Sequence, residues 1–216
     1  MNGKRKANER QENMKKNIHT AHQALRSTRL AMVPVSIDDA ADLYAYAKNP
    51  DVGPHAGWKP HESIEESRQI IEGLFLPSTA WGIHEIEGNG LPGPMIGTIA
   101  LEVDRFRPDT KSKEIGYSLA KDAWGRGYMT EAATEVIRYA FEDLGMEILT
   151  ICTSPVNKRS QRVAKKNGFT YEGRIRKAYR IYTGELRDSL VFSLTKEEWE
   201  KNPKPEVDTL KSTLEE

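Results

Sequence analysis

Hydrophobic and polar residues repeat with two different periods along this chain, and segments with one period alternate with segments with the other. Alternation with a period of two is typical of half-buried strands, whereas a period of three to four is typical of helices packed on one side. Strands are expected at residues 28–35, 79–87, 95–103, 113–120, 146–153, 169–178 and 186–194. Helices are expected at residues 36–50, 61–75, 128–145 and 157–168. This mixture predicts an α+β fold built in layers.

Two of the expected helices carry a clear apolar face. The helix at 61–75 begins with a capping box, in which Ser63 and Glu66 stand three residues apart. Helical spacing places its apolar residues near one face: Ile64, Ile71 and Leu74. The helix at 128–145 presents a second apolar face, made by Ala133, Val136, Ile137, Ala140 and Leu144. Both helices are therefore expected to pack against the sheet.

Two of the expected strands have faces of different character. On the strand at 95–103, one face holds Ile99, Leu101 and Val103. On the strand at 113–120, one side holds Ile115, Tyr117 and Leu119, and the other holds Glu114, Gly116 and Ser118. Because the second set is small or polar, this middle strand is a candidate for chemistry as well as for packing.

Composition excludes several classes of protein. The net charge is +0 over 216 residues, so the basic excess of a nucleic-acid binder is missing and we expect no nucleic-acid partner. Cys152 is the single cysteine, which rules out an internal disulfide framework. No run approaches the roughly 20 apolar residues of a membrane span. We therefore expect a cytoplasmic protein with no membrane partner.

The polar content changes at both ends of the chain. Residues 1–27 are polar and basic, and we expect a disordered leader or a solvated helix. Residues 28–200 should form one folded domain, because the chain is too short for two domains that each have a substantial hydrophobic core. Residues 201–216 are expected to be a C-terminal tail.

The stretch AWGRGYMTEA, residues 123–132, places a Gly-x-Gly turn directly before a helix. Glycines at 125 and 127 admit backbone conformations closed to other residues, and free N–H groups at a helix start bind anions. The motif is neither a P-loop nor a dinucleotide fingerprint, since Gly127 is followed by Tyr128 and Met129, with Thr130 where a third glycine would stand. A tight turn without a ligand is the alternative.

This turn and the blocks after it resemble one known superfamily. The blocks are EIGYSLAKDAWGRGYMTEA, then NKRS, then KKNGF followed by EG, then GELRD before the last strand. Together they resemble the GNAT acyltransferases, and within them the ribosomal-protein-alanine N-acetyltransferase branch, also called RimJ/RimL-like. The resemblance covers roughly residues 29–199. It implies the GNAT fold, a mixed central sheet of about seven strands with helices on both faces.

The resemblance further implies acetyl-CoA as co-substrate. The backbone of residues 125–129 would hold the pyrophosphate, and the pantetheine arm would pair with the middle strand where two parallel strands splay apart. The residues implied in cofactor binding are Gly116, Tyr117, Ser118, Trp124, Gly125, Arg126, Gly127, Tyr128, Met129, Thr130, Asn157 and Ser160. We expect no metal, since the five histidines show no metal-ligand spacing.

Two residues are candidates for catalysis. Ser160 matches a family position that hydrogen-bonds the coenzyme A sulfur, although a first-turn serine can also satisfy a helix N–H group. Most members place a tyrosine nearer the sulfur, where this chain has Ala164. Glu114 is the candidate general base, and a carboxylate on the outer face of the sheet is the alternative. Cys152, in an apolar strand, is expected to be inert.

The amine acceptor is the open question. The branch implies a protein N-terminal α-amine, such as that of a ribosomal protein, and the alternative is a small-molecule or peptide amine. Trp58 is expected to shape the acceptor cleft. An acidic lining around Trp58 and Asp104 would favour a basic peptide, and a closed apolar pocket would favour a small amine. A non-catalytic acyl-CoA sensor is the alternative of another class, and either a monomer or a homodimer is compatible with the sequence.

Overall fold

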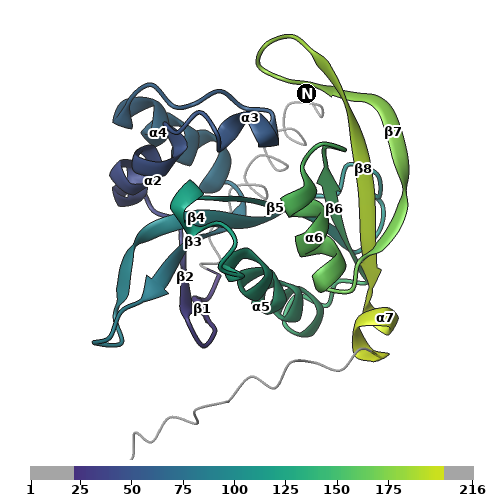
Figure 1. Ribbon diagram of the computed structural model, residues 1–216. Coiled ribbons are helices and arrows are strands. Elements are labelled where there is room, and N and C mark those ends of the chain that lie inside the picture. The colour runs from purple at the N-terminus through teal and green to yellow at the C-terminus, as the bar shows by residue number, and fades with distance from the viewer. Residues whose placement is uncertain (1–21, 202–216) are drawn as a thin grey trace, which may run out of the picture.

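The structure, a computed structural model, describes residues 22–201 and is built around one mixed sheet (Figure 1). Among the described residues the sheet has eight strands, in the order β1-β2-β3-β4-β5-β6-β8-β7. Every neighbouring pair is antiparallel except β5 and β6. The strands are β1 Leu25–Arg26, β2 Leu30–Pro34, β3 Thr79–Ile86, β4 Pro92–Val103, β5 Ser112–Leu119, β6 Ile148–Thr153, β7 Thr170–Arg180 and β8 Leu186–Thr195.

Helices cover both faces of this sheet, as the fold class predicts. Tyr117 and Ser118 are neighbours on β5, so their side chains point to opposite faces. Tyr117 contacts Ser160 on α6, whereas Ser118 contacts Tyr46 on α2. α5 and α6 lie side by side in Figure 1. The helical segments are η1 Ile37–Asp39, α2 Ala40–Ala47, α3 Gly53–Ala56, α4 Ile64–Ile70, η2 Ile71–Phe75, η3 Lys121–Ala123, α5 Tyr128–Glu142, α6 Lys158–Lys166 and α7 Lys196–Lys201.

The apolar face of α5 forms much of the core, as its spacing predicts. Ala133, Val136, Ile137 and Ala140 are all buried against the sheet. The expectation for Leu144 is wrong, because α5 ends at Glu142 and Leu144 is exposed beyond it. None of the helices in the described part of the chain is long and apolar enough to cross a membrane.

Two further expectations about buried faces are corrected. Ile71 is fully buried, but Ile64 and Leu74 expose 47% and 48% of their surface. The helix changes at Ile71 into the wider turns of a π-helix, which rotates the residues after it away from ideal helical spacing. Val103 is 75% exposed because it is the last residue of β4, beyond the cover of the core.

The fold begins earlier than the expected domain boundary at residue 28. β1 pairs with β2, and the His22 ring nitrogen Nε2 lies 2.8 Å from the Ala80 carbonyl oxygen. The Trp81 indole also donates a hydrogen bond to the Gln23 carbonyl at 2.9 Å. Residues 22–27 therefore belong to the domain. The rest of the expected leader and the expected tail beyond residue 201 lie outside the described residues.

Candidate active site

The parallel strands β5 and β6 separate part-way along their length. Their register holds for three residue pairs, the last of which joins Glu114 to Thr150. β5 then continues to Leu119 and β6 to Thr153, with no further pair between them among the described residues. The facing backbone groups beyond Glu114 can therefore pair with another extended chain, as the edge of a sheet does.

The Gly-x-Gly turn lies beside this gap. Gly125 and Gly127 have φ values of +78° and +84°, in the left-handed region that favours glycine. Gly127 precedes α5, and no side chain caps that helix. The first N–H groups of α5, at Tyr128, Met129 and Thr130, have no partner within the helix, and the helix dipole adds positive potential there. These residues and both glycines line a cavity of about 260 Å³, the first cavity.

α6 supplies the positive side of the first cavity. Arg159, Arg162 and Lys166 all line it and share one face of the helix. The Arg159 guanidinium lies 3.9 Å from the centroid of the Trp124 ring, which fixes its position by a cation–π contact. No aspartate or glutamate in the described part of the chain lines this cavity. The first cavity is therefore suited to an anionic ligand such as a pyrophosphate.

Two of the expected cofactor-binding residues lie outside the first cavity. Arg126 lines neither cavity, because its side chain pairs with Glu85 at 3.5 Å and lies over the Tyr128 ring. Gly116 lines the second cavity instead. The other expected residues do line the first cavity: Tyr117, Ser118, Trp124, Gly125, Gly127, Tyr128, Met129, Thr130, Asn157 and Ser160.

Ser160 and Tyr117 form a hydroxyl pair at the end of the first cavity. The Tyr117 Oη and Ser160 Oγ atoms are 2.8 Å apart. The helix-capping alternative applies to Asn157, whose Oδ1 accepts a hydrogen bond from the Ser160 N–H at 3.1 Å. The Ser160 hydroxyl itself therefore does not cap the helix. Burial raises the pKa of Tyr117 well above its ordinary value, so its hydroxyl stays protonated.

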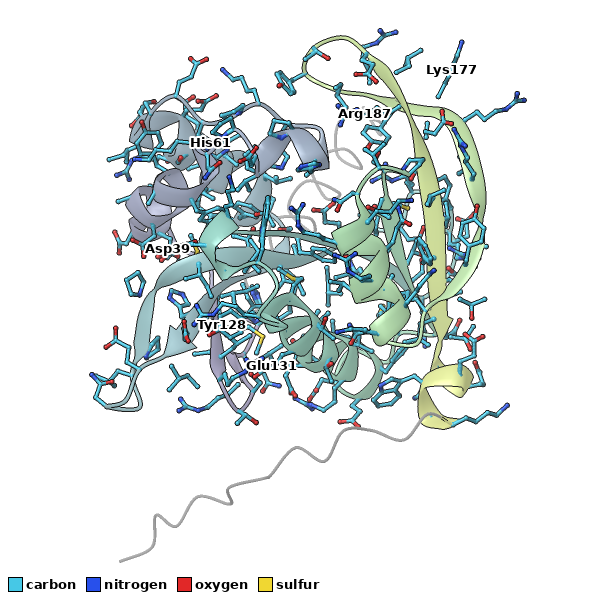
Figure 2. All side chains as sticks on the ribbon, in the orientation of Figure 1. Asp39, His61, Tyr128, Glu131, Lys177 and Arg187 are labelled. Carbon is cyan, nitrogen blue, oxygen red and sulfur yellow. The ribbon has the colours of Figure 1, made fainter. Side chains whose placement is uncertain are left out.

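A second cavity, of about 380 Å³, opens on the other side of this pair. Trp58 lines it, and so does Tyr179 of β7. The β7–β8 hairpin is held on α3 (Figure 2), since Arg187 donates a hydrogen bond to the Pro54 carbonyl at 2.7 Å. The apolar residues that line the second cavity are Leu43, Ala56, Trp58, Ile70, Leu74, Phe75, Ala100 and Ile115.

The two cavities meet at shared residues. Both are lined by His55, Ala56, Tyr117, Ser118, Asn157 and Ser160. A ligand that enters along the first cavity and a ligand in the second would therefore face each other at the hydroxyl pair of Tyr117 and Ser160.

The acidic groups of the second cavity agree in part with the sequence analysis. Asp104 does not contribute to an acidic lining, because it is buried outside the cavity, where it accepts hydrogen bonds from Thr150 Oγ1 and the Phe106 N–H. Glu114 does line the cavity, bound at 2.8 Å by both Nε and Nη2 of Arg105. Burial raises the pKa of Glu114, although Arg105 opposes the rise. Glu114 is thus buried in the site and does not face solvent on an outer surface.

Three site residues escaped the sequence analysis. Glu102 of β4, Arg105 and His61 all line the second cavity. These residues reach the cavity through the pairing of β4 with β5 and the packing of α4 on the fold, and neither contact can be predicted from a single sequence. Burial raises the pKa of the Cys152 thiol to about 12, which keeps it protonated and a poor nucleophile. Among the described residues no cluster of His, Cys, Asp and Glu could hold a metal ion.

Splayed parallel strands beside an uncapped helix start, opening onto a second cavity, define a class of protein: transferases that take an acyl group from coenzyme A. The chain belongs to the GNAT acetyltransferases, since the family model described as "Acetyltransferase (GNAT) domain" matches residues 29–170. It is an acetyl-CoA-dependent N-acetyltransferase.

Relatives and solved structures agree with this assignment. The chain is 28% identical to the uncharacterized N-acetyltransferase YoaA of Bacillus subtilis, over 80% of this chain and 96% of that one. It is 34% identical to the FsC-acetyl coenzyme A-N(2)-transacetylase of Aspergillus fumigatus, over 87% and 82%. A shorter match, 34% identical over 39% and 43%, is to the ribosomal protein uS5 alanine N-acetyltransferase of Escherichia coli. The GNAT acetyltransferase structure from Bacillus anthracis shares the fold, with a TM-score of 0.70, 20% identity and coverage of 81% and 99%.

Proposed function

We propose that this protein moves the acetyl group of acetyl-CoA directly onto a protein N-terminal α-amine, such as that of a ribosomal protein. The observation that carries the proposal is the meeting of the two cavities at Tyr117 and Ser160. A thioester at the end of the first cavity would face an amine in the second. Holding both reactants in one geometry supplies much of the rate enhancement of such a transfer.

The first cavity would hold the donor by its phosphates and its amides. The pyrophosphate would bind the N–H groups at the start of α5, and the cationic face of α6 would bind the remaining phosphate charge. The pantetheine arm would pair with β5 beyond Glu114, where β6 has moved away. Most of these contacts involve the backbone, so they do not depend on the Arg126 side chain, which points away from the first cavity.

The chemistry then follows from the groups at the junction. The neutral amine attacks the thioester carbonyl, a C–N bond forms, and a backbone N–H of β5 stabilises the oxyanion. When the intermediate collapses, the C–S bond breaks and the thiolate needs a proton. The Ser160 hydroxyl can give that proton and regain one from Tyr117, which is protonated at neutral pH and recovers its own proton from solvent. Ser160 would therefore be a catalytic residue and Tyr117 its proton reserve.

The second cavity supports an α-amine acceptor. Apolar residues form one part of its walls, and two glutamates, Glu102 and Glu114, outnumber the single arginine, Arg105, so that negative charge remains to attract an ammonium group. A small first residue could place its side chain against Trp58 while its amine approaches the junction. The partial likeness to the Escherichia coli ribosomal-protein enzyme agrees with such an acceptor.

A small amine is the second candidate acceptor. The apolar lining favours it, as does the likeness along most of the chain to the FsC-acetyl coenzyme A-N(2)-transacetylase. The two candidates differ in what lies beyond the reacting amine, because a peptide must continue out of the cavity and a small molecule ends within it.

Free-thiol release from acetyl-CoA separates these candidates. The purified protein would be assayed with peptides that begin with alanine, serine or methionine, with the same peptides blocked at the N-terminus, and with small amines that carry apolar groups. Release with free but not blocked peptides is the expected result. Release only with small amines would replace the protein acceptor by the second candidate.

A further inference from the structure

Glu102 of β4 lies directly over the part of β5 where the acetyl group would be delivered. It stands opposite Glu114 in the antiparallel register of β4 and β5, two residues along from the pairing of Ala100 with Gly116. A Cβ atom placed on Gly116 would lie 2.9 Å from Glu102 Oε1. The Glu102 carboxylate therefore occupies the space that the absent side chain of Gly116 leaves, two residues past the last pair of β5 with β6.

The two glutamates of the second cavity differ in what holds them. Both oxygens of Glu114 accept hydrogen bonds from Arg105, a bidentate pair that favours the charged form and opposes the burial that raises the pKa of Glu114. Glu102 accepts no hydrogen bond from any residue that the structure describes, and Arg105 acts on it only through its charge. Glu102 thus has lone pairs free for a ligand, whereas Glu114 is occupied.

The surroundings of Glu102 also raise its affinity for a proton. Burial raises the pKa of Glu102, the charge of Glu114 raises it further, and the charge of Arg105 opposes both effects. A carboxylate with a raised pKa is a better proton acceptor than an ordinary one. Glu114 therefore acts on Glu102 as a fixed neighbouring charge.

We propose that Glu102 is the catalytic base, which receives the proton that the acceptor ammonium loses before or during its attack on the thioester. This inference rests on the proposed function. The proton passes from the nitrogen to a Glu102 oxygen, directly or through one water molecule, and then to solvent. The nitrogen loses its second proton to solvent when the intermediate collapses to the amide. The thiolate receives a proton from Ser160, and a proton from solvent restores the pair of Ser160 and Tyr117. The overall reaction therefore converts a thioester and an ammonium into an amide, a thiol and one released proton.

The pH dependence of transfer tests this role, so the groups that face Glu102 across the cavity matter. They are Arg105, Glu114, Cys152, Tyr117, His55, His61 and Tyr179. Arg105 and Tyr117 keep their protons through the neutral range, and Cys152 does so because its pKa is about 12. His61 is the main alternative source of an enzyme limb in the pH profile, and burial lowers its pKa.

The variants E102Q and E102D would be compared with the wild type and with E87Q, a control at an exposed glutamate between β3 and β4. The measurement is kcat/KM for thiol release against pH, with two acceptors whose amine pKa values differ. The limb due to the amine moves with the acceptor, and the limb due to the enzyme does not. Acetyl-CoA affinity, measured by calorimetry, reports whether each variant is folded and loaded.

We expect E102Q to lower kcat/KM about 10²- to 10³-fold, to lose the acceptor-independent limb and to bind acetyl-CoA as the wild type does. E102D should keep the limb with intermediate activity, and E87Q should match the wild type. An E102Q variant that keeps the limb, or loses less than threefold in rate, overturns the inference, and loss of the limb in H61Q would assign it to His61. A wild type that transfers acetyl to no amine would overturn the proposed function as well.

Discussion

Replacing Ser160 with alanine tests the proton supply to the leaving thiolate. The change removes the Oγ atom that lies 2.8 Å from Tyr117 Oη and leaves the backbone of α6 capped by Asn157. The Tyr117 hydroxyl then keeps only the Ser160 carbonyl oxygen, at 3.4 Å. A buried hydroxyl without a partner costs about 1–3 kcal/mol of stability, and the remaining carbonyl keeps the cost near the lower end.

The effect on rate should be larger than the effect on stability. Loss of a positioned proton donor typically costs ~10²–10⁴ in rate, which corresponds to about 3–5 kcal/mol of barrier. Because acetyl-CoA is held mainly by the turn, α5 and α6, its affinity should stay within about threefold of the wild type, or less than 1 kcal/mol. S160A is therefore expected to lower kcat while leaving donor binding and folding nearly intact.

The assay is thiol release at saturating acetyl-CoA, paired with calorimetry for donor binding and with S36A as a control at an exposed serine that lines neither cavity. Y117F should be slow too, and the double variant should be scarcely slower than the worse single variant, because the two hydroxyls act as one unit. Near wild-type kcat in a folded S160A protein would refute this account of thiolate protonation.

Three further changes have expected outcomes. In G127V, a β-branched residue must adopt φ +84°, which costs about 1–2 kcal/mol and moves the N–H groups of the turn, so acetyl-CoA affinity should fall at least tenfold by calorimetry. G88V, at an open turn, is the control. Equal acetyl-CoA affinities in G127V and the wild type would contradict the anion-binding turn. R159M should weaken acetyl-CoA binding several-fold at low salt and less at high salt. An equal loss of affinity at both salt concentrations would show that the charge of Arg159 does not contribute to binding. Burial raises the pKa of Glu131, but hydrogen bonds from Ser27 and Arg29 outweigh burial, so the pKa is lowered. E131Q should therefore lose about 1–3 kcal/mol of stability at pH 7 and match the wild type once the pH falls below the lowered pKa. Urea unfolding at both pH values measures this difference, and an equal gap at both would contradict the sign.

Most of the fold was accessible from the sequence because local patterns encode it. The alternation along residues 113–120 predicted a strand, and the apolar spacing of residues 133–140 predicted a helix and its buried face. Both predictions are confirmed. The errors fell at element ends. Ile64, Leu74 and Val103 match the period of their neighbours but are exposed. Ile64 is the first residue of α4, Leu74 lies in the π-helical turn, and Val103 is the last residue of β4.

The site was accessible only in part, because its geometry depends on distant segments. The turn at Gly125 and Gly127 is a local motif with a local physical meaning. The hydroxyl pair of Tyr117 and Ser160 joins residues 43 apart, and spacing alone gives no sign of it. Glu102 reaches the site through the register of β4 with β5, which places it opposite Glu114.

The central claim is that the two cavities bring acetyl-CoA and an amine together for direct transfer. Incubation with acetyl-CoA and an alanine-initiated peptide, followed by mass spectrometry of the peptide and measurement of free thiol, tests it most directly. The account predicts one acetyl group on the peptide α-amine for each thiol released, with none on the protein. Thiol release without acetylated amine, or an acetylated protein as an intermediate, would contradict direct transfer.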